Sequence, residues 1–474
     1  MKQLKTAAVA AITAAITVAL LSGHSGNTHD NHSIAADPTT KNVRIGTFNL
    51  SFDRRSYADL VTEMKLTRVE QDALMDKWFN NTLNDEDKAV AEKVIQIKNI
   101  AAIIQTERPA VLLMAEFNND GTGEDLEAIQ GFRLNYLSVP QNALGSTADK
   151  VELLKPIQFG YAQSFATNTG LLSEFDLDHN GTVSLPGDAW GFGVYHGQYA
   201  FGVLSQYPID TNNIRTFQNF KWKDMPGAAN PTITNCNDAN KPLPAGMTCG
   251  DNWYTDQAWA AKPMSSKNHV DAPIIIPTAN GDKVVHLLLS HPTPPVFDTF
   301  TENNKQLNRA EIKFWNDYIS GDASYIYDDA GHKGGIATDA SFVILGDLNA
   351  DPQSGDGYLD TIKDLLHSDK VNQYATHGVN IPTSLGGPEC LAMGECKEQN
   401  WATRYPDSLT NTSGLRLDFV MPSADLNVTD SGVFWPASFE DGRLMMNDKR
   451  VGKWGGGGKS VSSDHRLVWV DIAL

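Results

Sequence analysis

Two polar clusters beside apolar runs constrain the fold of this chain most. Asp347 and Asn349 come just after one apolar run, and Asp464 and His465 come just before another. A short run of Phe, Val, Ile and Leu bounded by glycine is typical of a buried strand, and strand ends are common positions for functional side chains. Two carboxylates, an amide and an imidazole gathered there can bind a hard divalent cation and transfer protons beside it. This combination suits phosphoester hydrolysis.

The first 36 residues are typical of an export signal followed by the start of the mature chain. Lys2 and Lys5 precede a weakly apolar segment, rich in Ala and Thr, that ends near Gly23. This pattern indicates a secretory signal peptide, with a single membrane anchor as the alternative. No cysteine follows the segment where a bacterial lipid attachment needs one. We therefore expect a secreted or periplasmic protein, cleaved near Gly23 or near Ala36.

The four cysteines form two local pairs. In an oxidising compartment we expect two short-range disulfides, Cys236–Cys249 and Cys390–Cys396. The alternative, a cysteine-only metal site, lacks the Cys-x-x-Cys spacing of zinc ribbons.

The formal net charge of the chain is −19, and the sequence shows no basic cluster that would bind nucleic acid by electrostatic attraction. A nuclease is still compatible with this charge, because a bound cation can reverse the field locally.

Strand-like and helical patterns alternate along the rest of the chain. Strands are expected at 43–50, 110–115, 200–204, 284–290, 342–345 and 415–421, and helical spacing runs over 58–104 and 309–319. No Pro/Ser linker divides the chain, so we expect one domain over 41–474, with insertions near 51–107 and 140–270. Strands that alternate with helices predict an α/β layered fold.

Eight polar residues stand at the ends of these strand-like runs. They lie within Thr47-Phe48-Asn49, Met114-Ala115-Glu116, Ser290-His291-Pro292, Gly346-Asp347-Leu348-Asn349-Ala350, Arg416-Leu417-Asp418-Phe419 and Ser463-Asp464-His465. Taken singly, each residue has an ordinary explanation, such as a loop that caps its own backbone. The set in this order resembles the endonuclease/exonuclease/phosphatase superfamily, the group of deoxyribonuclease I, exonuclease III, the neutral sphingomyelinases and inositol polyphosphate 5-phosphatases. The stretches 191–199 and 291–298 look like a secreted bacterial branch of it.

The resemblance implies an α/β four-layer sandwich, with two packed mixed β-sheets flanked by helices, in a single domain with enlarged loops. It also implies a metal site, at which Glu116 would be the principal carboxylate ligand of Mg²⁺ or Mn²⁺. Asp464 would lie close by, and Asn49 would help to hold metal or phosphate.

The resemblance further implies catalytic roles for hydrolysis by in-line attack of a metal-activated water. Asp347 and Asn349 would orient and activate the water. His465, aligned by Asp418, would act as general base or phosphate clamp. His291 would stabilise the developing charge or protonate the leaving oxygen. Whether Asp347 or His465 takes the proton stays open at the level of sequence.

A second metal site is suggested by Asp176, Asp178 and Asn180, which alternate like the opening of a calcium loop. Gly187 stands where the bidentate Glu of such a loop is expected, and Asp188 could serve as a late ligand instead. A structural Ca²⁺ site and a plain Asx-rich turn are both compatible with this short motif.

Three classes of phosphoester substrate fit these features: small organic phosphates, nucleic acid and phospholipid head groups. The acidic balance favours small phosphates. One alternative is a lipid phosphodiesterase resembling the sphingomyelinases, whose loop around Trp253 and Trp259 would touch a bilayer. The other is a catalytically silent binding module on the same fold. Nothing in the sequence implies a stable protein partner, and we expect a monomer.

Overall fold

Two mixed β-sheets form the centre of the computed structural model, which describes residues 41–238, 241–321, 323–396, 405–451 and 460–474. The predicted signal segment, residues 1–36, lies outside these ranges. Sheet 1 has the order β10 (Asn427–Val433), β11 (Val468–Ala473), β1 (Asn42–Phe52), β2 (Val111–Phe117), β4 (Phe201–Ser205) and β3 (Tyr161–Ser164). Sheet 2 has the order β5 (Arg215–Thr216), β6 (His269–Thr278), β7 (Gly281–Ser290), β8 (Ser341–Asp347) and β9 (Asp418–Pro422). Each sheet contains one parallel pair, β1–β2 or β7–β8, among antiparallel neighbours.

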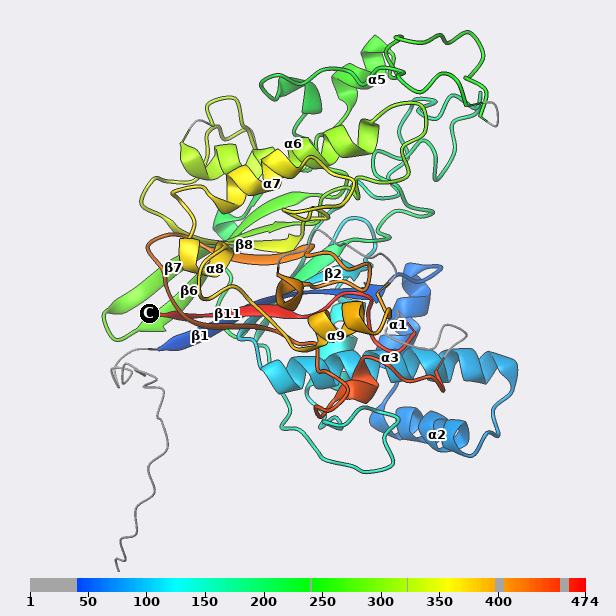
Figure 1. The fold of residues 1–474 in the computed structure, drawn as a ribbon, viewed down its shortest axis with the longest axis vertical. Helices are drawn as coiled ribbons and strands as arrows, with labels where there is room; N and C mark the ends of the chain where they lie inside the picture. The colour runs from blue at the N-terminus through cyan, green and yellow to red at the C-terminus, as the bar shows by residue number, and fades with distance from the viewer. Residues whose placement is uncertain (1–40, 239–240, 322, 397–404, 452–459) are drawn as a thin grey trace, which may run out of the picture. The chain divides into compact units, whose positions relative to one another are not determined.

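Helices cover the outer face of each sheet (Figure 1). On sheet 1 these are α1 (Tyr57–Lys65), α3 (Asp85–Glu107) and α4 (Glu127–Phe132), with α2 (Arg68–Phe79) farther out. On sheet 2 they are α6 (Asn303–Ser320) and α7 (Leu359–Leu366). Shorter helices are α5 (Asp256–Ala261), α8 (Gln373–Thr376), α9 (Gly386–Ala392), a π-helical turn (Arg133–Leu137), and 3₁₀ turns at Thr211–Asn213, Trp222–Asp224, Pro406–Ser408 and Arg443–Met445. The predicted four-layer α/β sandwich is confirmed.

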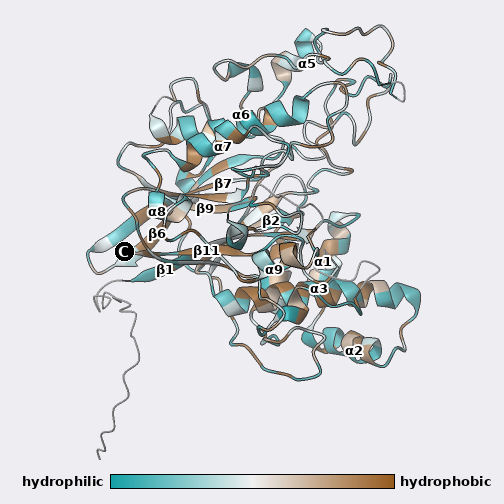
Figure 2. Ribbon diagram, in the orientation of Figure 1, coloured by the Kyte–Doolittle hydropathy of each residue, from teal (hydrophilic) through white to brown (hydrophobic). Residues whose placement is uncertain are grey.

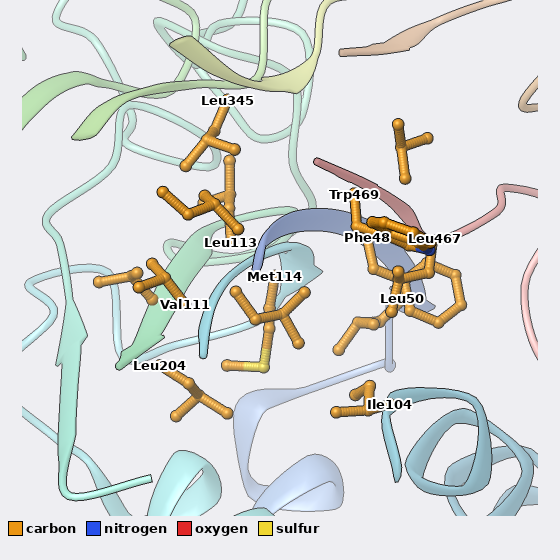
Figure 3. Close-up of a cluster of buried hydrophobic side chains, with 14 of the residues drawn as sticks. Phe48, Leu50, Ile104, Val111, Leu113, Met114, Leu204, Leu345, Leu467 and Trp469 are labelled. Atoms are coloured by element: carbon orange, nitrogen blue, oxygen red, sulfur yellow. The ribbon is translucent and has the colours of Figure 1, made fainter. Parts of the chain in front are cut away.

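The strands of sheet 2 alternate between two hydrophobic cores. In β8, Val343 and Leu345 pack into the core between the sheets, whereas Phe342 and Ile344 pack under the outer helices. Figure 3 shows Leu345 directed toward Leu113 of β2, and Figure 2 shows the apolar residues gathered on the strands between the helical layers. The side chain of Asp347, two residues after Leu345, therefore projects into the space between the sheets.

The largest helical insertion has clear local signals at both ends. The Asn84 side chain accepts the backbone N–H of Asp87 and caps α3. The helix ends at Arg108, which adopts the left-handed conformation directly before Pro109. The segment 58–104 thus forms three helices, α1 to α3.

The first strand departs from its expected end. We expected a strand over 43–50, but β1 continues to Phe52, and its register with β2 shifts between Asn49 and Phe52. Ser51 has a positive φ of 52° at this irregularity. Such bulges redirect side chains, and this one lies beside the predicted site.

Two disulfides join the cysteine pairs expected from the sequence. Cys236 is bonded to Cys249 and Cys390 to Cys396, with Cα–Cα distances of 5.6 and 5.3 Å. None of the helices in the described part of the chain has the length and apolarity needed to cross a bilayer.

Candidate active site

The sheet topology brings the predicted site residues to one edge of the sandwich. Asp347 is the last residue of β8, and Asp418, the first residue of antiparallel β9, pairs with it directly. Because Asp347 lies two residues after Leu345, its side chain projects between the sheets. His291 directly follows β7, the parallel neighbour of β8, and so lies at the same edge.

Backbone strain accompanies these positions. Glu116 in β2 has a φ of 52° and Asn349 has a φ of 49°. Non-glycine residues seldom adopt the left-handed region, and those that do are concentrated at functional sites. At Glu116 this conformation interrupts the ordinary alternation of the strand.

Asn49 connects the two sheets. Its Nδ2 donates to Glu116 Oε1 at 3.2 Å and to Asp347 Oδ2 at 3.0 Å. Its Oδ1 accepts the backbone N–H of Ser51 at 3.1 Å. In this structure the amide therefore orients both carboxylates, and its predicted contact with metal or phosphate stays a prediction.

Asp464 is held by Ser51, a residue that sequence reasoning missed. Ser51 Oγ donates to Asp464 Oδ1 at 2.7 Å and lies 2.8 Å from Ser463 Oγ. Ser463 Oγ in turn donates to the Asn49 carbonyl at 2.6 Å. These bonds place Asp464 beside the bulge in β1, next to the residue that orients Glu116.

Two imidazoles converge on one oxygen of Asp347. His291 Nε2 lies 3.4 Å and His465 Nε2 lies 3.5 Å from Asp347 Oδ2. On its other side, His465 Nδ1 lies 2.8 Å from Asp418 Oδ2. All four side chains are buried. A carboxylate behind an imidazole fixes its tautomer and orientation, and here His465 stands between two of them.

The two histidines differ in their electrostatic surroundings. Burial lowers the pKa of His291, and nearby Lys267 lowers it further, so His291 is neutral at pH 7. Burial opposes the charge of His465 too, but Asp418 and Asp347 outweigh it and raise the pKa of His465 well above 7. The same imidazoles hold the pKa of Asp347 far below its usual range against the effect of burial. The site thus contains an ionised carboxylate against an imidazolium.

Asn349 and Asp418 are each fixed by further bonds. The backbone N–H of Asn349 donates to Asp347 Oδ1, and its Nδ2 donates to the Pro292 carbonyl, both at 3.0 Å. These bonds leave the Asn349 amide oxygen as the group that can orient a water. Thr410 Oγ1 donates to Asp418 Oδ2 at 2.7 Å and thereby holds the carboxylate that aligns His465.

Helix α6 holds the loops of the site together through two buried polar residues one turn apart. Asn308 Nδ2 donates to the carbonyls of Thr293 and Leu348 at 2.8 and 3.0 Å. Glu311 accepts the backbone N–H groups of Thr293 and Ser266 at 2.6 and 2.8 Å. Residues at i and i+3 share one helix face, so one turn of α6 fixes three loops.

Lys267 is a further residue that sequence reasoning missed. It is only 5% exposed, and its charge interacts with Glu311, Asp347 and Glu116. Burial lowers its pKa, and these carboxylates oppose that effect. A single lysine in a loop sequence carries no signal of such burial, because the carboxylates around it come from three other elements.

The chemistry of the donor set fits a hard divalent cation. Glu116 and Asp464 are half-buried and supply carboxylate oxygens, the first bonded to Asn49 and the second to Ser51, and oxygen ligands are those that Mg²⁺ and Mn²⁺ prefer. Asp347, Asp418 and His465 also have ligand atoms within 4.8 Å of one another. These three are hydrogen-bonded or paired among themselves, so they suit proton handling rather than metal binding.

The candidate calcium loop also gathers its acidic residues. Carboxylate oxygens of Asp176, Asp178 and Asp188 lie within 4.8 Å of one another. Asp188 is buried and accepts the Ser184 N–H at 2.7 Å, and Asn180 Nδ2 donates to Asp178 at 2.9 Å. These bonds are those of an Asx-rich turn, and the clustered oxygens are also the kind of ligand that Ca²⁺ takes.

The chain matches the model of a known protein family. The model of the endonuclease/exonuclease/phosphatase family matches residues 46–465. Similar solved structures include an endonuclease/exonuclease/phosphatase from Beutenbergia cavernae DSM 12333, with 13% identity over 91% of this chain and 72% of that one, at a TM-score of 0.40. Another is a mannosyl-6-phosphatase from Bacteroides thetaiotaomicron VPI-5482, with 10% identity over 91% of this chain and 100% of that one, at a TM-score of 0.37. A third is beta toxin from Staphylococcus aureus, with 12% identity over 90% of this chain and 99% of that one, at a TM-score of 0.35. No curated protein sequence matches the chain. Because the family model spans most of its length, the chain belongs to the endonuclease/exonuclease/phosphatase family.

Proposed function

We propose that this protein is an exported, metal-dependent hydrolase of phosphodiester or phosphomonoester bonds. The observation that carries the proposal is the convergence of His291 and His465 on one oxygen of Asp347, which Asn49 links to Glu116. This arrangement joins a group suited to proton transfer and phosphate binding to a group suited to metal binding. The two disulfides support export to an oxidising compartment.

The electrostatics assign different tasks to the two sides of Asp347. His465 lies between two carboxylates that favour its protonated form, and a protonated imidazole cannot accept a proton from water. It suits a clamp on the scissile phosphate. Asp347, ionised and oriented by the Asn349 N–H, is the acceptor that remains beside it. Neutral His291 can donate a hydrogen bond to the leaving oxygen.

Glu116 and Asp464, with Asn49, would hold Mg²⁺ or Mn²⁺. When bound, such a cation polarises the phosphoryl group and lowers the pKa of its water. Glu116 and Asp347 favour the charged form of buried Lys267, against the effect of burial, which lowers its pKa. In that form Lys267 would stabilise the negative charge that develops on phosphate oxygens in the transition state.

Small organic phosphates are the substrate class we favour, because the chain is acidic overall and the positive charge of the site is buried. The lipid phosphodiesterase alternative required a membrane contact around Trp253 and Trp259. Trp253 stacks on Phe300 with ring centroids 5.7 Å apart, and Trp259 packs on Trp222 at 5.1 Å. These rings form the local core of their own loop, which argues against a bilayer contact there.

Hydrolysis of a chromogenic phosphodiester and the matching monoester tests the proposal. We expect turnover with Mg²⁺ or Mn²⁺ that is abolished by chelator and by Glu116→Ala or His465→Ala. The Lys267→Met variant should lose about 10²-fold or more in kcat, the scale for removing one preorganised electrostatic contact. Lys305→Met, a change on the surface of α6, is the matched control.

A readout independent of turnover separates the enzyme from a silent module. Mn²⁺ should raise the melting temperature of the parent protein and not that of Glu116→Ala, because a ligand that binds only the folded state stabilises it. Metal binding without turnover of any ester would favour the silent module. Turnover that survives both chelator and Glu116→Ala would overturn the metal-dependent mechanism.

A further inference from the structure

A cavity of about 640 Å³ lies between α7, α8 and the chain just before β9, at the edge of sheet 2. None of the proposed catalytic or metal-binding residues lines it. Its buried wall includes Arg416, Thr376 and Asp351, and its exposed rim includes Lys363 and two histidines. Cavities of this volume are typical of sites for small molecules.

Arg416 is the unusual residue of this cavity. Its side chain is only 8% exposed, yet it forms no ion pair with any residue in the described part of the chain. Among the described residues its side chain donates one hydrogen bond, from Nη1 to the Thr376 carbonyl at 3.1 Å, and its guanidinium lies over the ring of Phe419 at 4.7 Å. Burial lowers its pKa to about 10, and the charge of Asp351 opposes this only in part. A buried cation of this kind normally has a counter-ion.

Asp351, the acidic residue on this wall, is committed to other bonds. Its Oδ2 accepts the backbone N–H of Arg416 at 2.7 Å, and its Oδ1 accepts those of Gln353 and Ser354 at 2.7 and 2.9 Å. The carboxylate thus shapes the loop rather than pairing with the guanidinium. No other residue in the described ranges accepts a hydrogen bond from the Arg416 side chain, so its remaining donors can bind a ligand.

The rim adds further basic groups. The rings of His367 and His377 lie 4.3 Å apart, and Lys363 lies one helical turn before His367. His367 Nδ1 lies 2.8 Å from the Lys363 carbonyl and His377 Nδ1 lies 3.1 Å from Thr376 Oγ1. In the described part of the chain neither Nε2 has a hydrogen-bond partner. The rim thus places one lysine and two imidazoles around the buried arginine.

We propose that this cavity binds a phosphate group, with Arg416 as its buried counter-ion and Lys363, His367 and His377 at its entrance. The planar guanidinium donates to two oxygens of a tetrahedral oxyanion at once, and such charge-assisted pairs are among the strongest hydrogen bonds in proteins. The volume leaves room for the remainder of a phosphorylated small molecule. This phosphate site is separate from the proposed active site, and the inference does not depend on the proposed hydrolysis.

Calorimetric titration of inorganic phosphate and of glycerol 3-phosphate into the full-length mature protein tests this inference. The titrations use the His465→Ala variant with chelator, so that phosphate binding at the proposed active site is suppressed. We expect Arg416→Met to weaken binding by about tenfold or more, as for loss of a charge-assisted pair. Arg309→Met, which removes an exposed arginine paired with Asp360, should leave binding unchanged.

The following results decide the outcome. Binding of glycerol 3-phosphate as tight as that of inorganic phosphate would identify an esterified phosphate group as the ligand, and binding of inorganic phosphate alone would identify the free ion. Equal affinity in Arg416→Met and its parent, or no binding of either probe, would overturn the proposal. If Arg416→Met does not fold, His377→Asn at the exposed rim provides the second test, and unchanged affinity there would count against the site.

Discussion

Replacement of Asp418 by asparagine tests the core of the proposed mechanism. Asp418 Oδ2 is 2.8 Å from His465 Nδ1 and accepts a hydrogen bond from Thr410 Oγ1 at 2.7 Å. Asparagine has almost the same shape, so the fold is retained while the negative charge behind the imidazole is lost. His465 then keeps only Asp347, 3.5 Å from its Nε2, as a close carboxylate.

The expected effect follows from these contacts. A hydrogen bond to a charged group contributes about 1.5–3 kcal/mol, which corresponds to roughly 10- to 150-fold in rate. In serine proteases, the same replacement of the aspartate behind the histidine also leaves the imidazole in the wrong tautomer, and kcat falls by about 10⁴-fold. We therefore expect kcat/KM of Asp418→Asn to fall by about 10²- to 10⁴-fold. Because Asp418 raises the pKa of His465, the remaining activity should shift toward lower pH.

The assay is the rate of chromogenic phosphoester hydrolysis from pH 5 to 9, with saturating Mg²⁺. Asp425→Asn is the matched control, because it removes one aspartate charge just after β9 and outside the proposed site. A value of kcat/KM within about threefold of the parent, with an unshifted pH profile, would refute the view that Asp418 acts through His465.

Three further predictions concern metal binding and stability. Ser51→Ala removes the 2.7 Å bond to Asp464 and should weaken Mn²⁺ binding by about 10- to 100-fold, the usual scale for a group that orients a metal ligand; equal affinity by calorimetry would contradict the proposed metal site. If the loop at Asp178 binds Ca²⁺, the ion should raise the melting temperature of the parent by a few degrees and leave Asp178→Ala unchanged; no response in the parent would identify a plain turn. Burial lowers the pKa of His269 from 6.5 to about 4, so the unfolded chain binds the proton first and stability is lost as the pH falls from 6.5 through 4. That loss is up to about 3 kcal/mol. Urea unfolding of His269→Gln should show a correspondingly weaker loss between pH 7 and pH 4, and an unchanged loss would show that other groups cause it.

Much of the framework was predictable because its signals are local. Apolar runs predicted the positions of β2, β7 and β8, and helical spacing indicated the inserted helices. The polar residues at the strand ends were visible for the same reason, since a run of apolar residues and the polar residue after it are neighbours in the chain. The patterns did not single out β6 or β10, and the insertion expected near 140–270 includes the start of β6.

What the sequence alone determined was therefore the layered fold, the cysteine pairs and the set of polar residues at strand ends. Only the tertiary structure decided how those residues meet. Asn49 and Asp347 are 298 residues apart, and their hydrogen bond exists because the two sheets pack face to face. Ser51, Lys267 and Glu311 gained their places at the site in the same way. Their local sequence resembles that of any polar loop or helix, because burial and charge at a site depend on contacts between distant elements rather than on neighbours in the chain.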